Sequence, residues 1–104
     1  MRRVDTSKFD FGVKIMLWYV YIVKCQDNTL YTGITKNVLN RIHDHNYSKS
    51  GAKYTRSRRP VILMYQETMQ NQHDAIKREC EIKKLTRIKK IHLITGNNND
   101  TNTI

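Results

Sequence analysis

The sequence predicts a small α+β domain, in which a three-stranded antiparallel sheet is flanked by helices in the element order ββαβαα. Two short segments rich in aromatic and β-branched residues, separated by turn residues, indicate a β-hairpin. Apolar residues at helical spacing follow, and two basic helical segments end the patterned part of the chain. With 104 residues the chain has room for one compact domain, so one functional site is expected.

The hairpin is expected to pair residues 18–24 with residues 30–34, because Gln26-Asp27-Asn28 between them is typical of a turn. Thr35 to Asn37 then offer N-caps for a helix that continues to about His45. The pattern alone does not fix which strand lies at the centre of the sheet.

Val38, Leu39 and Ile42 give this helix an apolar stripe that should face the sheet. Arg41 and His45 are four residues apart and border the stripe, so a cation and an imidazole share one edge of the helix. From spacing alone, both a surface role and a functional role stay open for this pair.

A polar segment at residues 46–59 ends at Pro60, which predicts a loop before a third strand at residues 61–65. Residues 73–85 and 87–93 have the pattern of two basic helices.

The first of these helices carries a carboxylate on its apolar side. Ala75, Glu79 and Ile82 lie at i, i+4 and i+7, so Glu79 belongs to the face that packs inward. A buried carboxylate is costly unless it is paired or bound to a metal ion. An ion pair with Lys83 and a role as a metal ligand are therefore the two alternatives.

Three tyrosines lie on the hairpin, and alternation places Tyr19 and Tyr21 on one side of their strand, with Tyr31 on the next strand. Each one taken singly is compatible with simple packing and a solvated hydroxyl.

The formal net charge is +10, from 19 Lys and Arg against 9 Asp and Glu, and this favours a polyanion such as nucleic acid as partner. A membrane surface is less favoured, because no basic amphipathic helix with large apolar anchors is evident. The longest apolar run, residues 16–23, is too short to span a bilayer, and an intracellular, soluble protein is expected. Cys25 and Cys80 are expected to be reduced packing residues.

The ends of the chain lack the pattern of its middle. Residues 1–15 are expected to be a flexible extension, and Met16 offers an alternative start before a domain at residues 16–95. Gly96 should stop the last helix, and residues 96–104 should form a disordered tail.

Tyr19-Val20-Tyr21, followed ten residues later by Tyr31-Thr32-Gly33, resembles the paired tripeptides of the GIY-YIG nucleases. Arg41 stands eight residues after Gly33, where this family has its essential arginine, and His45 follows four residues later. Glu79 matches the glutamate that the family carries in a later helix.

A further segment, Ala52-Lys53-Tyr54-Thr55-Arg56 leading to Arg59-Pro60, resembles the small standalone subgroup related to the catalytic module of structure-specific junction nucleases. The chain departs from the family pattern at Tyr19 and Val20, which replace Gly and Ile. It also has Ile34 where some relatives carry a Lys beside the scissile phosphate.

The resemblance implies a metal-dependent DNA endonuclease. Glu79 would hold one Mg²⁺ or Mn²⁺, Arg41 would contact the scissile phosphate, and Tyr21 would orient or deprotonate the water with help from His45. Tyr31 would bond to the phosphate or to the nucleophile network, and Gly33 would let backbone approach the site closely.

Around this site, a basic loop and basic helices should bind phosphates without reading sequence. The nucleic-acid-binding residues expected are Lys53, Tyr54, Arg56, Arg58, Arg59, Lys83 and Lys84. Branched or flapped DNA is the implied substrate, in repair, recombination or genome processing, and no small-molecule organic cofactor is expected. Structure-specific relatives often work with a protein partner. Compartment depends on the host, nucleus or cytoplasm, and the Asn-, Lys- and Ile-rich composition is compatible with a viral source.

Two alternative functions belong to other classes. One is a catalytically silent or partner-dependent binding module, against which the full set of Tyr21, Tyr31, Arg41, His45 and Glu79 argues. The other is an RNA-acting or RNA-binding protein, because a basic surface with exposed tyrosines also suits single strands.

Overall fold

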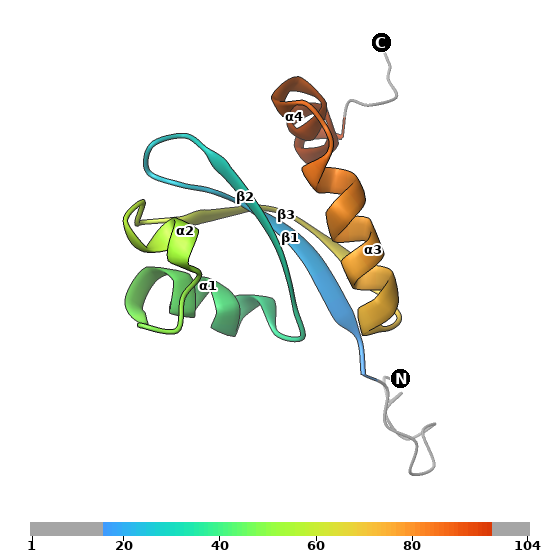
Figure 1. The fold of residues 1–104 in the computed structure, drawn as a ribbon, viewed down its shortest axis with the longest axis horizontal. Coiled ribbons are helices and arrows are strands. Elements are labelled where there is room, and N and C mark those ends of the chain that lie inside the picture. Colours follow the sequence, from blue (N-terminus) through green and yellow to red (C-terminus); the bar gives the residue numbers. More distant parts are fainter. Residues whose placement is uncertain (1–15, 97–104) are drawn as a thin grey trace, which may run out of the picture.

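The computed structural model describes residues 16–96, so the predicted extension at residues 1–15 and the tail at 97–104 lie outside the described residues. The predicted α+β class and the order ββαβαα are confirmed, with one short helix added (Figure 1). The elements are β1 (Trp18–Lys24), β2 (Leu30–Thr35), α1 (Val38–Tyr47), α2 (Lys53–Arg56), β3 (Ile62–Met69), α3 (Gln72–Lys83) and α4 (Arg87–Thr95). In this part of the chain no helix has the length and apolar character needed to cross a membrane.

Strand β1 lies at the centre of the sheet, between β2 and β3, and pairs with both of them in the antiparallel sense. Tyr21 in the middle of β1 lies opposite Gly33 of β2 and opposite Gln66 of β3. The β1–β3 ladder shifts register between Ile22 and Val23, which indicates a bulge or irregularity at this point. Because β1 is covered on both sides, it supplies the most buried side chains of the domain.

Each face of the sheet has its own apolar cluster. On one face, Val20 and Ile22 pack with Ala75 and Ile82 of α3. On the other face, a second cluster contains Tyr21, Val23, Cys25 and Val61, with Ile42 of α1 packed against it. The sheet therefore separates α1 from α3, as Figure 1 shows. The side chain of Tyr21 belongs to the α1 face.

The predicted apolar stripe of α1 is wrong at one position. Val38 is buried and Ile42 packs on the sheet, but the Leu39 side chain is 80% exposed. Val38, Ile42 and His45 follow the i, i+4, i+7 spacing of one helical face, and Leu39 lies about 100 degrees from Val38 around the axis. Leu39 therefore points away from the core.

The third strand and the loop before it also differ from expectation. Residues 53–56 form the helix α2 inside the predicted loop, and β3 continues to Met69, beyond the predicted end at residue 65. As an edge strand, β3 alternates between exposed and half-buried positions, so polar residues extend it without an apolar run. Cys25 is buried as expected, whereas Cys80 is exposed, so its predicted packing role is wrong.

The helix ends agree with local capping chemistry. The side chain of Asn37 accepts a hydrogen bond from the Asn40 amide at 3.0 Å, and the Thr86 hydroxyl accepts one from the Lys89 amide at 3.2 Å. Gly96 ends α4 with a φ of 75°, in the left-handed region that glycine tolerates. These caps fix where α1 and α4 begin and where α4 stops.

A cluster of charged and polar side chains joins helix α3 to strand β3. The Arg78 guanidinium donates to both carboxylate oxygens of Glu67, at 2.7 and 3.2 Å, and to Glu81 at 3.1 Å. The hydroxyl of Tyr65 also donates to Glu67. The two donors together lower the pKa of Glu67 against the opposing effect of its burial. This bidentate pair sets the position of α3 on the sheet.

Replacing Ile82 with Ala should lower the free energy of unfolding by about 2–4 kcal/mol, because Ile82 is fully buried between α3 and the sheet. Ile88→Ala is the matched control, since Ile88 is 67% exposed on α4, and it should change stability by less than about 0.5 kcal/mol. Urea denaturation followed by circular dichroism measures both. Equal effects of the two substitutions would contradict the packing described for α3.

Candidate active site

A chain of three buried side chains lies between α1, α2 and the central strand. The Tyr21 hydroxyl is 2.7 Å from Nε2 of His45, and Nδ1 of His45 is 2.7 Å from the Thr55 hydroxyl. His45 and Thr55 are 0% exposed, and Tyr21 is 1% exposed. Residues from three different elements therefore share one line of hydrogen bonds that is shielded from bulk solvent.

The direction of these hydrogen bonds follows from the Thr55 hydroxyl. This group has one hydrogen, which it donates to the Ala52 carbonyl at 3.0 Å. Thr55 can then only accept from His45, so Nδ1 carries the imidazole proton. Nε2 is left as an acceptor, and the Tyr21 hydroxyl donates to it. The imidazole thus presents a basic nitrogen to a tyrosine.

Burial controls the protonation of this pair. It lowers the pKa of His45 to about 4, and the positive charges of Arg41 and Arg59 act in the same direction. Burial also raises the pKa of Tyr21 to about 12. Near neutral pH, both side chains are therefore uncharged and the proton stays on the tyrosine.

The absence of a side chain at Gly33 leaves the space that the Tyr21 ring occupies. A Cβ atom at position 33 would lie 2.6 Å from the Tyr21 hydroxyl oxygen and 2.8 Å from the ring carbon that bears it. Any larger residue would push the phenol away from His45. The predicted close approach at Gly33 is present, and what approaches is the Tyr21 side chain from the neighbouring strand.

A second tyrosine flanks the same imidazole. The Tyr31 ring meets the His45 ring edge-on, with centroids 5.4 Å apart, and stacks on Tyr54 at 5.9 Å. The Arg58 guanidinium covers the Tyr54 ring at 4.0 Å. Tyr31 is half-buried, so it is the more accessible of the two tyrosines at His45.

Arg41 and Glu79 bring opposite charges to the same region. The Arg41 guanidinium lies close enough to Tyr21 to lower its pKa, and Glu79 lies close enough to raise it, so burial is only the largest of several influences. Arg41 donates to the Ser50 carbonyl at 3.1 Å. Glu79 is 18% exposed on its side chain and pairs with Lys83 at 3.3 Å. The predicted inward position of Glu79 and its predicted alternative partner are both present.

The carboxyl end of α1, which carries His45, is held from outside the helix. The Arg59 guanidinium donates to the carbonyls of His45 and Ser48. The Asn46 amide bonds to both backbone groups of Val61, at 2.7 and 3.1 Å. Gly51 packs so closely that a Cβ there would lie 2.7 Å from a carbonyl oxygen of α1. The imidazole is therefore fixed by its backbone as well as by its ring nitrogens.

The residues predicted to bind nucleic acid fall into two groups. Several already have partners: Arg58 pairs with Asp27 at 3.1 Å, Arg59 binds α1, and Lys83 pairs with Glu79. Arg56 is exposed but donates to the Gly51 carbonyl at 3.5 Å, and Lys53 and Lys84 are exposed. The binding role of all seven residues stays a prediction.

Sequence reasoning gave Thr55 no role of its own, although the segment that contains it was singled out for its resemblance to the small standalone subgroup. The available signal was an uncharged hydroxyl residue between Tyr54 and Arg56 in an otherwise basic stretch. It also missed Asn46 and the Glu67–Arg78 pair, whose partners lie 15 and 11 residues away in sequence.

Comparisons with known proteins agree with this architecture. The GIY-YIG catalytic domain matches residues 17–92. A "UPF0213 protein" of Desulfotalea psychrophila is 56% identical over 77 residues, covering 74% of this chain and 70% of that protein. A "UPF0213 protein" of Staphylococcus haemolyticus is 57% identical over 76 residues, covering 73% and 92%.

Two structures solved by solution NMR are similar in fold. The UPF0213 protein of Bacillus halodurans is 41% identical, with a TM-score of 0.51, covering 79% of this chain and 86% of that one. A protein of E. faecalis is 37% identical, with a TM-score of 0.53, covering 83% and 92%.

The low pKa of His45 should make stability depend on pH. In the unfolded chain the imidazole gains a proton near pH 6.5, whereas in the folded protein it does so only near pH 4. Protonation therefore favours unfolding as pH falls through this window. The free energy of unfolding should be about 2 kcal/mol lower at pH 5 than at pH 7. Urea titrations should show this drop in wild type and in His43→Gln, but a much smaller one in His45→Gln.

Replacing Thr55 with Val keeps the shape of the side chain but removes the acceptor for the His45 Nδ1 proton. We expect a loss of about 1–3 kcal/mol in unfolding free energy and a shift of the imidazole away from the Nδ1-protonated tautomer. Thr55→Ser should retain both properties. Nitrogen-15 NMR of the imidazole distinguishes the tautomers, and an unchanged spectrum in Thr55→Val would refute the assigned hydrogen-bond direction.

Proposed function

The chain belongs to the GIY-YIG catalytic-domain family, a family of nucleases that act on nucleic acid, and from this membership we propose that it is a metal-dependent DNA endonuclease. The observation that carries the proposal is the buried chain from Tyr21 through His45 to Thr55, with Arg41 and Glu79 close enough to influence Tyr21. Phosphodiester hydrolysis needs an activated water, a cation against the developing phosphorane charge, and stabilisation of the leaving oxygen.

Arg41 is proposed to bind the scissile phosphate. One guanidinium nitrogen donates to the Ser50 carbonyl, which orients the side chain, and an arginine has five donor hydrogens in total. Donors therefore remain for the phosphate oxygens. Arginine suits this role because its planar fork bonds two oxygens at once and does not lose its charge.

Tyr31 and Tyr21 are proposed to have different roles in activating the water. Tyr31 is half-buried and supports a direct contact with the water, whereas Tyr21 is almost fully covered and already donates to His45. Tyr21 would therefore orient the reacting groups from the buried side of the site. If its hydroxyl takes up the proton of the water, its own proton moves along the existing hydrogen bond to Nε2 of His45.

Glu79 is proposed to hold one Mg²⁺ or Mn²⁺. Within residues 16–96 no group of three His, Cys, Asp or Glu side chains suits a metal ion, and we assign the Glu79 carboxylate as the protein ligand. This fits Mg²⁺, which keeps much of its water and accepts phosphate oxygens. A bound divalent ion would supply positive charge at the phosphate and the leaving oxygen. Binding requires Glu79 to exchange its Lys83 partner for the ion.

The substrate is proposed to be branched or flapped DNA, of the kind processed in repair and recombination. The net charge of +10 supports binding to phosphates, and exposed basic residues lie on α2 and at the end of α3, on opposite sides of the sheet. Within the described residues no additional domain for reading bases is present, which supports recognition of shape over sequence.

Labelled linear duplex, flap, four-way junction and single-stranded DNA, each beside its RNA counterpart, should be incubated with wild type and with Glu79→Gln or Arg41→Lys, in Mg²⁺, Mn²⁺ or chelator. We expect cleavage by wild type only with metal, strongest on a branched substrate. Each variant should cut about 100-fold more slowly or worse, with binding retained. Glu81→Gln is the matched control, since Glu81 is a more exposed carboxylate on the same helix and its replacement amide can still accept from Arg78, and it should cut normally.

Binding without cleavage by all of these proteins would overturn the proposal in favour of a binding module that is silent or needs a partner. Preferential cleavage of the RNA counterparts would replace DNA as the substrate.

A further inference from the structure

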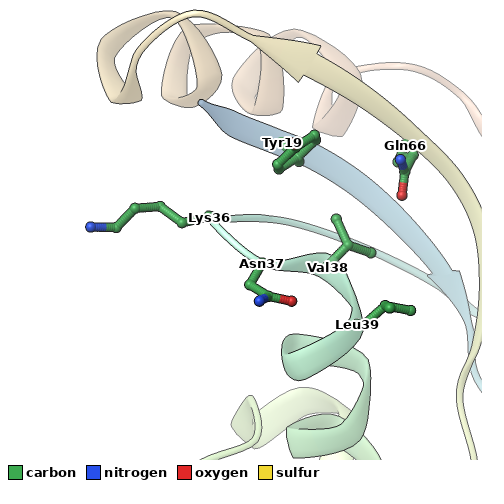
Figure 2. Close-up of a pocket in the computed structure, with 6 residues that line it drawn as sticks. All are labelled: Tyr19, Lys36, Asn37, Val38, Leu39 and Gln66. Carbon is green, nitrogen blue, oxygen red and sulfur yellow. The ribbon is translucent and has the colours of Figure 1, made fainter. Parts of the chain in front are cut away.

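An open hollow lies beside the Tyr21–His45 pair, between the sheet and the first turn of α1. Its volume is about 330 Å³, and it is lined by Tyr19, Lys36, Asn37, Val38, Leu39 and Gln66. Figure 2 shows Tyr19 and Gln66 projecting from the strands toward the turn that carries Val38 and Leu39. A second hollow of about 270 Å³ shares Tyr19 and Lys36 with it and extends toward Met16.

The hollow adjoins the candidate active site without containing any of its residues. Gln66 lies opposite Tyr21 in the β1–β3 ladder, so both side chains belong to the same face of the sheet. Tyr19 is two residues before Tyr21 and also lies on this face. On α1, Arg41 is one turn after Asn37, and its amide bonds to the Asn37 carbonyl. A nucleotide chain held at Arg41 therefore has its next unit within reach of the hollow.

The lining combines the two kinds of group that a nucleobase needs. The Tyr19 ring, with Val38 and Leu39 across from it, offers apolar surface for a flat base. The Gln66 amide is exposed, and it has both donors and an acceptor for the edge of a base. Lys36 is at the rim, and its ammonium lies over the Trp18 ring, 5.5 Å from the ring centroid.

The exposure of Leu39 also supports binding of a flat apolar ligand in this hollow. A leucine that is 80% exposed at the edge of a polar hollow contributes nothing to the core, and contact with a flat apolar ligand would remove its surface from water. A single flat base fits within a hollow of this size and can contact both the apolar lining and the Gln66 amide.

We propose that this hollow seats the base next to the cleaved phosphate, with Tyr19 and Leu39 on its faces and Gln66 on its edge. This proposal rests on the proposed nuclease function, because the position of the base is defined relative to the phosphate that the candidate active site would cleave. One amide side chain discriminates weakly among bases, so the seat fixes the position of the strand more than its sequence. It takes an unpaired or flipped base, because a base in a duplex has both faces covered.

The test uses the full chain with chelator, so that binding is read without cleavage. 2-Aminopurine, a fluorescent adenine analogue, is placed in turn at each position around the branch point of a flap substrate. We expect a large change in fluorescence at one position only, next to the phosphate that is cut when metal is added. Leu39→Asn and Gln66→Ala should each weaken binding of this DNA by about tenfold and remove the signal.

Ile88→Asn is the matched control, because Ile88 is a similarly exposed apolar residue on α4. Loss of binding in this control as well, or a signal at no position, would overturn the seat. Cleavage by wild type without a position-specific signal would leave the nuclease function and reject the seat. A signal that Leu39→Asn removes, in a protein that never cuts, would reject the nuclease and keep a base-binding site.

Discussion

The single hydrogen of the Thr55 hydroxyl determines the direction of each hydrogen bond in the Tyr21–His45–Thr55 chain. Because it is given to the Ala52 carbonyl, Thr55 can only accept from His45, and His45 in turn can only accept from Tyr21. A short helix, a longer helix and the central strand are thereby joined into one polar line through an apolar face. A buried line of this kind is stable only when each member is satisfied, so each element must sit within hydrogen-bond distance of the next.

The basic residues of the chain serve two purposes that its net charge does not separate. Arg59 and Arg78 bind carbonyls and carboxylates of the protein itself, and they hold α1 and α3 in place. Other basic residues within residues 16–96, Lys53 and Lys84 among them, are exposed and can meet a polyanion. The basic residues therefore supply the net charge that attracts nucleic acid, and some of them also hold the helices around the site in place.

The sequence predicts this fold where local chemistry decides it. Alternation and turn residues define the hairpin, and Asn37 begins its helix through its own side chain. Leu39 was misplaced because a stripe of neighbouring apolar residues is wider than the face that the sheet covers. Thr55 was missed because its importance depends on Ala52 and His45, and the approach of α2 to α1 is not encoded in any local pattern. The tyrosines, Arg41, His45 and Glu79 were found together only through resemblance to a family, since no single spacing joins them.

Because the Arg78–Glu67 pair holds α3 to β3, the Glu79 carboxylate can change partners while the helix stays in place. Arg78 fixes the helix backbone through Glu67, whereas the ion pair between Glu79 and Lys83 is made by two side chains on the same helix. The Glu79 carboxylate can thus leave the ammonium by rotation about its own single bonds, with no rearrangement of the fold. A change within one side chain needs no hinge or lid motion, which would take microseconds or longer. The backbone that carries Glu79 is therefore fixed, and it does not have to move before the carboxylate exchanges Lys83 for the proposed metal ion.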